Sequence, residues 1–248
     1  MGWKEEGKRA CIREALWCGF SPGADADVRW RHFLVFPLCT GIFWGALQRV
    51  AAREPDLLAS LEGHYNRVRT LEARFIQRHT LGSVTRVESG KVYFLKPGRM
   101  RWEYESPEEK LFLSDGTYVY LYVPAERHVS RSRLADTADW RVPFALLLGR
   151  IDFSELFSRV EIHRVERPAR APLTQLRALP KSQRQGFTEI WLDVNEARRL
   201  ERIEIRQAGG VLMEFHFREW REGHALAPDL FRLRVPPGTA WVDAPLGP

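Results

Sequence analysis

Cysteine is scarce in this chain of 248 residues. Its three cysteines, Cys11, Cys18 and Cys39, all lie in the first 40 residues, and no pair has C-x-x-C spacing. Neither a disulfide framework nor a zinc site is therefore supported. The histidines after residue 60 are scattered, and none has the i, i+4 spacing of a helical metal site. We expect no metal ion and no cofactor.

Long runs of one charge are also missing. The 38 Lys and Arg residues are interspersed with 32 Asp and Glu residues, which leaves a formal charge of +6. Because no run holds five or more like charges, the sequence predicts no nucleic-acid partner.

Sequence signatures of catalysis are equally sparse. The chain has no P-loop and no dinucleotide-binding fingerprint. Residues 19–23, GFSPG, match G-x-S-x-G, but no core strand precedes the serine and Pro22 follows it directly, so we attribute the match to chance. Glu103 and Glu105 share one strand face, whereas paired catalytic carboxylates need a cleft between them. We therefore expect a protein that is not an enzyme.

An apolar run near the N-terminus has the features of a secretory signal. Residues 32–47, HFLVFPLCTGIFWGAL, carry no Asp, Glu, Lys or Arg and follow Arg29 and Arg31. The run is shorter than the roughly 20 residues of a membrane-spanning helix. Val50 and Ala52 supply the small residues of a cleavage site, so we predict cleavage after Ala52. Residues 1–52 would then be an extension plus signal peptide, and residues 53–248 a single exported domain.

The first 27 residues fit a signal peptide poorly, because such a peptide normally begins at its basic flank. We therefore expect translation to start near Val28. A lipidated Cys39 is the rival use of this segment, but Leu38 stands where a lipoprotein signal has Gly, Ala or Ser.

Alternation of apolar and polar residues dominates the rest of the chain. Segments such as TEIWLDV and RIEIR have the period of strands with one apolar face, which is typical of an antiparallel sheet solvated on its other face. We expect a further strand over residues 231–235, a loop with a brief edge strand over residues 165–186, and a type I′ turn at Asp115-Gly116. So many strands joined by short turns predict a sheet curled toward a barrel.

Three segments have helical features. An apolar stripe predicts an amphipathic helix over residues 55–69. Residues 140–150 and 151–160 are short and intensely apolar, with Pro143 at a helix start, Gly149 at its end and Asp152 placed to cap the next helix. We expect these helices to cover the apolar side of the sheet, either as simple core packing or as a movable plug over an apolar ligand.

Several short motifs follow one another along the chain after the predicted signal. They are Ala73-x-Phe75-x-Gln77, Lys96-Pro97-Gly98-Arg99-Met100-Arg101-Trp102, Ser114-Asp115-Gly116, Tyr122-x-Pro124, Pro143-x-x-Leu146-Leu147, Leu179-Pro180-Lys181 and Phe231-x-Leu233-x-Val235-Pro236-Pro237-Gly238. Their order resembles that of the LolA family of periplasmic lipoprotein carriers. Each motif is weak alone, but the shared order covers most of the chain after the predicted signal.

The resemblance implies a mainly β fold with short helices, an unclosed antiparallel β-barrel covered by a helical lid. Its apolar interior would accept the acyl chains of a lipoprotein, and shielding each methylene from water is worth about 0.8 kcal/mol. The residues expected to line this cavity are Met100, Trp102, Tyr104, Ile190, Leu192, Ile203, Ile205, Met213, Phe215, Phe217, Phe231 and Leu233. The residues expected in the lid are Phe144, Leu147, Leu148, Phe153 and Leu156.

The resemblance also implies partners and a compartment. We expect a periplasmic monomer that receives acylated lipoproteins from an inner-membrane ABC transporter of the Lol type and delivers them to an outer-membrane lipoprotein receptor. The alternatives are a periplasmic lipid-binding sensor or a general lipid carrier of the same fold.

One position departs from the family pattern. An arginine commonly precedes the proline of the KPGR motif and helps to hold the lid, whereas this chain has Lys96. Lysine lacks the planar five-donor fork of arginine, so either the lid is held more loosely or Arg99 substitutes. The pattern of residues 118–123 does not decide whether the tyrosines or the aliphatic residues point inward.

Overall fold

The computed structural model describes residues 54–137, 144–149, 152–168, 170–182 and 186–243. All of them belong to the compact unit Val50–Pro248. The three cysteines, the GFSPG match, the predicted signal peptide with its cleavage site, and Pro143 lie outside the described residues.

Three α-helices are present in the described part of the chain. They are α1 (Glu54–Arg67), α2 (Ala145–Leu148) and α3 (Phe153–Leu156), and none is long and apolar enough to cross a membrane. Helix α1 confirms the predicted amphipathic helix, because Leu61 and Tyr65 of its apolar stripe are buried. Asp152 caps α3 as predicted, accepting hydrogen bonds from the backbone N–H groups of Ser154 (2.8 Å) and Glu155 (3.2 Å).

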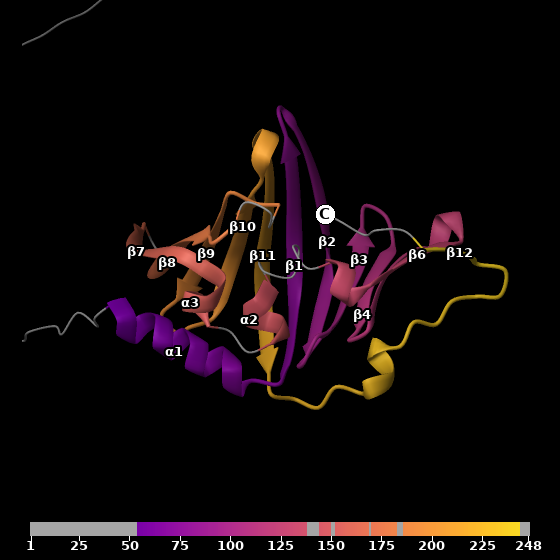
Figure 1. Ribbon diagram of the computed structural model, residues 1–248, viewed down its shortest axis with the longest axis horizontal. Coiled ribbons are helices and arrows are strands. Elements are labelled where there is room, and N and C mark those ends of the chain that lie inside the picture. Colours follow the sequence, from indigo (N-terminus) through magenta and orange to yellow (C-terminus); the bar gives the residue numbers. More distant parts are fainter. Residues whose placement is uncertain (1–53, 138–143, 150–151, 169, 183–185, 244–248) are drawn as a thin grey trace, which may run out of the picture. The chain divides into compact units, whose positions relative to one another are not determined.

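A single sheet contains twelve strands, and all but one pair of neighbours are antiparallel (Figure 1). The strands are β1 (Thr70–Leu81), β2 (Val84–Leu95), β3 (Arg99–Ser106), β4 (Lys110–Asp115), β5 (Tyr118–Val123), β6 (His128–Arg133), β7 (Phe157–Arg167), β8 (Arg170–Pro180), β9 (Glu189–Asn195), β10 (Leu200–Arg206), β11 (Val211–Glu222) and β12 (Ala240–Asp243). Their order is β12-β6-β5-β4-β3-β2-β1-β11-β10-β9-β8-β7. Because β12 and β7 are the two edges of this order, the sheet is unclosed, as predicted.

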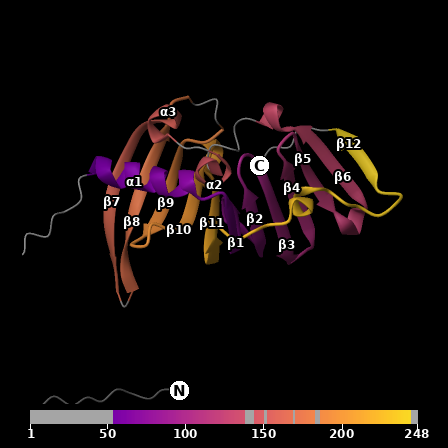
Figure 2. The ribbon, with the colours of Figure 1, turned by 90° about the horizontal axis from the view of Figure 1, so that it is seen from below.

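The helices lie on one face of the sheet, which we call the inner face (Figure 2). Alternate strand residues point to this face and form one continuous apolar core with the helices. Its buried members from the strands include Leu71, Ala73, Phe75, Val92, Phe94, Met100, Trp102, Leu176, Ala178, Ile190, Leu192, Val194, Leu200, Ile203, Ile205, Met213, Phe215 and Phe217.

Gly90 in β2 leaves room at the centre of the inner face. It pairs with Phe75 on one side and Tyr104 on the other, and a Cβ atom at this position would lie 1.8 Å from the Glu103 carbonyl oxygen. The rings of Phe75 and Tyr104 therefore meet across the glycine, with centroids 5.0 Å apart. A residue with a side chain would prevent this approach.

The opposite, outer face is less exposed to solvent over β9 and β10 than the alternation predicts. Glu189, Asp193 and Glu204 are only 6–8% exposed. Arg202 binds Asp193 (2.7 Å) and Glu204, and Arg206 binds both Glu204 (2.6 Å) and Glu189 (2.6 Å). A lattice of guanidinium and carboxylate groups thus covers this part of the sheet, which we call the charge lattice.

The strand predicted at residues 231–235 is wrong. A 3₁₀ turn spans Pro228–Phe231, and the residues after it belong to no strand until β12, which pairs with β6 in parallel. Arg101 donates to the Leu230 carbonyl oxygen (3.1 Å), and Arg101 pairs with Leu113 on the face opposite Met100 and Trp102. The segment therefore crosses the outer face, where it buries Phe231.

The loop with a brief edge strand predicted at residues 165–186 is wrong over residues 165–180, because β7 and β8 form a long hairpin there. Its prolines occupy positions that a sheet tolerates. Pro168 lies between the strands, Pro172 lies beside the register shift between Val165 and Arg167, and Pro180 ends β8. The helix expected over residues 151–160 is shorter than predicted, since β7 begins at Phe157.

The turn between β4 and β5 is not of type I′, because only Gly116 has a positive φ (98°). Asp115 instead accepts hydrogen bonds from the backbone N–H groups of Thr117 (2.7 Å) and Tyr118 (2.8 Å) through its carboxylate. The pairing of β3, β4 and β5 also decides the open question of residues 118–123. Val119 pairs with Ser114, the partner of Met100, so the aliphatic residues point to the inner face and the tyrosines to the outer face.

Candidate functional site

Trp102 lies at the centre of the inner face. Its ring makes edge-on contacts with Phe75 (4.8 Å between centroids) and Phe215 (5.3 Å), and further ring contacts with Phe94 and Phe217. Its indole N–H has the Met100 sulfur as acceptor, at 3.4 Å. Strands β1, β2, β3 and β11 thus present a surface of aromatic rings and thioether, which is apolar and adaptable.

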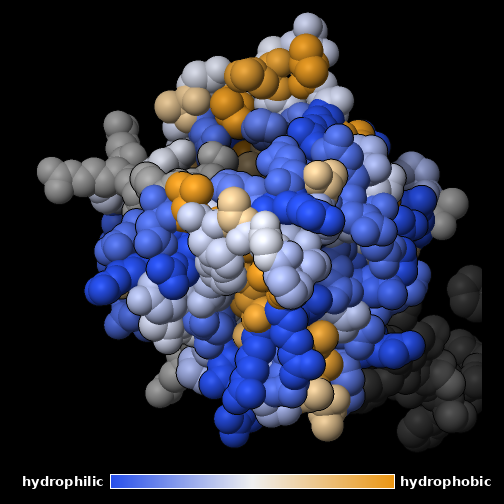
Figure 3. All heavy atoms as spheres, turned by 90° about the vertical axis from the view of Figure 1, so that its right-hand side faces the viewer, coloured by the Kyte–Doolittle hydropathy of each residue, from blue (hydrophilic) through white to orange (hydrophobic). Residues whose placement is uncertain are grey.

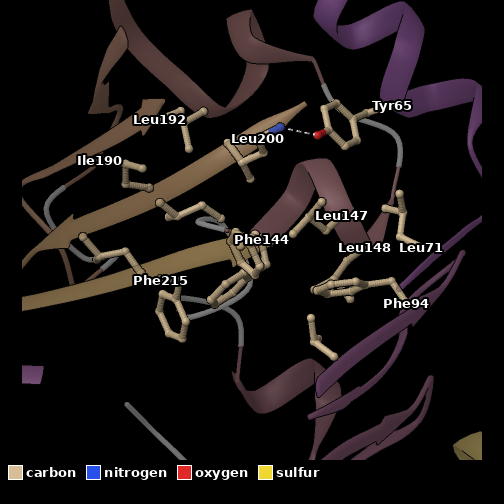
Figure 4. Close-up of a cluster of buried hydrophobic side chains, with 14 of the residues drawn as sticks. Tyr65, Leu71, Phe94, Phe144, Leu147, Leu148, Ile190, Leu192, Leu200 and Phe215 are labelled. Carbon is tan, nitrogen blue, oxygen red and sulfur yellow. Dashed lines mark hydrogen bonds between the residues drawn. The ribbon is translucent and has the colours of Figure 1, made fainter. Parts of the chain in front are cut away.

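Helix α2 and the residue before it cover this surface (Figure 4). Phe144 contacts Trp102 (5.4 Å between centroids) and Phe215 (5.1 Å). Leu147 is fully buried, and Leu148 is 7% exposed. The structure therefore brings these three predicted lid residues against the predicted cavity residues.

Helix α3 covers the neighbouring strands. Phe153 is buried in the same core, with its ring 6.0 Å from that of Phe157, and Leu156 packs against the core while half-buried. The backbone N–H of Phe153 donates to Glu62 of α1 (2.7 Å). Helices α1 and α3 are thereby joined.

The KPGR motif joins β2 to β3, and its residues form hydrogen bonds with the helices that the sequence did not predict. The backbone N–H of Gly98 donates to the Leu148 carbonyl oxygen of α2 (2.8 Å). Lys96 is buried, and its ammonium donates to the Tyr65 carbonyl oxygen at the end of α1 (2.7 Å). Arg99, the other residue expected to hold the lid, is exposed. The contact with α2 is therefore made by main-chain atoms.

Burial changes the acid–base properties of this corner. Removal from water lowers the pKa of Lys96 to about 8, because the charged ammonium loses hydration. Burial also raises the pKa of Tyr65, whose hydroxyl accepts a hydrogen bond from the backbone N–H of Leu200 (2.9 Å). The same tyrosine thus ties α1 to β10 through its hydroxyl and to Lys96 through its carbonyl.

Two of the motifs that suggested the family meet at this corner. Ser114, which is fully buried, donates from its hydroxyl to the Gly98 carbonyl oxygen (2.8 Å). The same hydroxyl oxygen accepts from the backbone N–H of Gly116 (3.3 Å). Ser114 therefore fixes the turn that presents Gly98 to α2, a role that spacing along the chain could not predict.

The apolar surface ends toward the β1–β2 turn in a row of polar groups, which we call the polar belt. Tyr104 donates from its hydroxyl to Gln77 (2.7 Å), and Lys110 binds the buried carboxylate of Glu88 (2.7 Å) while lying over the Tyr104 ring (4.3 Å). Burial raises the pKa of Tyr104, so its hydroxyl stays protonated. Tyr104, predicted as a cavity residue, therefore marks the boundary of the apolar surface.

Two predicted cavity residues are not part of this surface. Phe231 is buried on the outer face, outside the main core, and Leu233 lies in the irregular segment that follows it. The turn that contains Phe231 contacts β3 and β4 on the outer face. The remaining ten predicted cavity residues are on the inner face. Among the described residues, no three His, Cys, Asp or Glu side chains lie close enough together to hold a metal ion.

Comparison with known families identifies the fold. Residues 66–234 match the family model described as outer membrane lipoprotein carrier protein LolA. The chain belongs to the LolA family. Two LolA-type relatives, each named outer-membrane lipoprotein carrier protein, come from Nitrosomonas europaea and Cupriavidus taiwanensis. The first is 31% identical over 72% of this chain and 85% of the relative, and the second is 30% identical over 84% and 97%.

A solved structure shares the fold of this chain. An uncharacterized conserved protein from Thermus thermophilus superposes with a TM-score of 0.50 at 16% identity, over 77% of this chain and 98% of that protein. At that identity the likeness concerns the fold alone.

Proposed function

We propose that the inner face binds the acyl chains of lipoproteins and that the described arrangement is the closed form, in which α2 occupies the place of the ligand. The supporting observation is that Phe144 and α2 cover the aromatic surface of the inner face. Phe144, Leu147 and Leu148 make apolar contacts, which are not directional, so an acyl chain can replace them at little cost. The Gly98–Leu148 hydrogen bond would then be exchanged for one with water.

The proposed carrier acts in the periplasm and passes cargo from an inner-membrane ABC transporter to an outer-membrane lipoprotein receptor. The names of the LolA relatives support this direction of transport. Such a role requires no catalytic group, since binding and release need only a difference in apolar burial between carrier and acceptor.

Native mass spectrometry tests the proposal. Purified protein is incubated with a triacylated lipoprotein and, separately, with a diacyl phospholipid. We expect a one-to-one complex with the lipoprotein, weakened in Phe215→Ala, where an inner-face ring is removed. Phe231→Ala is the matched control, because it removes a buried ring from the outer face.

Preferential binding of the phospholipid would instead favour a general lipid carrier. Depletion of the protein in cells, followed by membrane fractionation, then tests delivery. Lipoproteins that still reach the outer membrane at the normal rate would contradict the proposed transport.

A further inference from the structure

The end of the β1–β2 hairpin carries an exposed apolar cap. The cap consists of Leu81 and Val84, which are 56% and 70% exposed; Val87, level with Arg78 in the strand pairing, is 48% exposed. Leu81 and Val84 face each other across the two-residue turn Gly82-Ser83. The hairpin stands above the neighbouring strand ends in Figure 1, and the apolar group at the top of Figure 3 lies over it.

This cap is separate from the proposed acyl-binding surface. The polar belt of Gln77, Tyr104, Glu88 and Lys110 lies between the two along the same strands. The cap is therefore no continuation of the core, and cargo bound at the inner face would leave it exposed.

Within residues 78–87, the only formally charged side chains are those of two arginines. Residues 78–87 contain Arg78, His79 and Arg86 but no Asp or Glu. Arg78 is exposed. Arg86 forms ion pairs with Glu88 (3.0 Å) and Glu108 (3.4 Å), two carboxylates that lie outside this segment. At about 3.4 Å per residue, the two arginines lie roughly 7–10 Å behind Leu81 and Val84.

The hairpin also has a fixed form. Thr80 and Thr85 share a hydrogen bond between their hydroxyl groups (2.9 Å), and β1 and β2 pair without interruption from Leu81 and Val84 inward. An apolar cap on a hairpin that is already ordered loses little conformational entropy when it binds.

The size of the cap decides between kinds of partner. A stable protein interface buries about 800 Å² on each side, far more than the two aliphatic side chains of the cap offer. A small apolar tip with basic residues about 7–10 Å behind it matches instead a lipid interface, where apolar groups enter to about 5–10 Å and cations meet the phosphates.

We propose that residues 78–87 dock on the surface of a bilayer containing anionic phospholipid. Leu81 and Val84 enter the boundary between headgroups and acyl chains, and Arg78 lies at the level of the phosphates. This inference goes beyond the proposed cargo binding, which requires only the inner face.

Sedimentation with lipid vesicles tests the docking. Vesicles of phosphatidylcholine alone are compared with vesicles that also contain phosphatidylglycerol. The purified protein is expected to bind the anionic vesicles, and Leu81→Ser/Val84→Ser to lower the partition coefficient about tenfold or more. Arg78→Gln should lower it about fivefold on anionic vesicles only. Val242→Ser, at a comparably exposed aliphatic residue on β12, is the matched control and should leave it unchanged.

A second measurement leaves the cap intact. An environment-sensitive fluorophore on Ser83→Cys, in a chain whose Cys11, Cys18 and Cys39 are serine, should brighten and shift to the blue with anionic vesicles. The proposal is overturned if the fluorophore does not respond, or if Leu81→Ser/Val84→Ser binds vesicles like the unaltered protein. Thermal unfolding and lipoprotein binding of the serine variants should be unchanged, which separates this result from any failure of the carrier proposal.

Discussion

The inner and outer faces of the sheet are both closely packed, but by contacts of different kinds. On the inner face Trp102 and its neighbours meet Phe144 and Leu147 through apolar contacts. On the outer face the charge lattice joins β9 and β10 through paired side chains, and the segment around Phe231 contacts β3 and β4. Apolar contacts can be replaced by an acyl chain, whereas a buried carboxylate needs its own partner. The proposed binding of acyl chains requires this difference, because only the contacts on the inner face would be exchanged for contacts with cargo.

The largest effect is expected from two tryptophans on opposite faces. Trp102→Ala should lower the free energy of unfolding by about 3–5 kcal/mol, because it empties the centre of the core. Trp191 lies on the outer face between Arg177 and Arg206, whose guanidinium groups are 5.6 and 5.4 Å from its ring centroid. Trp191→Ala should cost only about 1–2 kcal/mol, the worth of two partly exposed cation–π pairs. Urea unfolding measures both values, and equal losses would contradict the difference between the faces.

Two buried phenylalanines separate stability from binding. Phe215→Ala and Phe231→Ala should each cost about 3–5 kcal/mol, because each ring is nearly fully buried. Only Phe215→Ala is expected to weaken binding of a triacylated lipoprotein, measured by titration under conditions where both variants are folded. A comparable loss of binding in Phe231→Ala would indicate that Phe231 belongs to the binding surface after all.

A pH titration tests the buried ammonium beside α1. Burial lowers the pKa of Lys96 to about 8, below the value of about 10.4 for an unfolded chain. Between these values the unfolded state binds more protons, so this group should make the free energy of unfolding rise with pH. Lys96→Met should lack that rise. The comparison is made by urea unfolding between pH 7.5 and about 9, where tyrosines of ordinary pKa remain mostly protonated; parallel curves for the two proteins would exclude the effect.

The smallest effect is expected at the rim of the charge lattice. Arg206 is 48% exposed, so Arg206→Ala should cost at most about 1 kcal/mol despite its two ion pairs. High salt should reduce the cost further. A loss above about 3 kcal/mol, measured by urea unfolding in low salt, would show that the lattice stabilises the sheet as strongly as the aromatic core.

The sequence predicted the features that depend on local periodicity. Period-two alternation in β9, β10 and β11 follows from one buried face, and the stripe of Leu61 and Tyr65 follows from helical geometry. Ten of the twelve predicted cavity residues lie on the inner face for the same reason.

What the sequence could not predict depends on contacts between distant segments. Phe231 alternates with its neighbours like a strand residue, but it is buried in a 3₁₀ turn that contacts β3 and β4 on the outer face. The prolines near and within β8 made this hairpin look like a loop. The sheet accepts Pro172 because it lies beside a register shift, which no local sequence pattern encodes. The link between Gly98 and Leu148 uses only main-chain atoms, so no side-chain type marks it.

The Gly98–Leu148 hydrogen bond also limits what mutagenesis can reveal. Replacing the side chain of Leu148 leaves its carbonyl oxygen in place, and any side chain at Gly98 adds backbone strain, because φ there is +70°. An alanine scan would therefore attribute to packing or strain what belongs to this bond. Replacing the Gly98 amide by an ester removes the single N–H donor and keeps every side chain. A chemically synthesised ester variant can therefore measure the strength of the Gly98–Leu148 contact, which mutagenesis cannot.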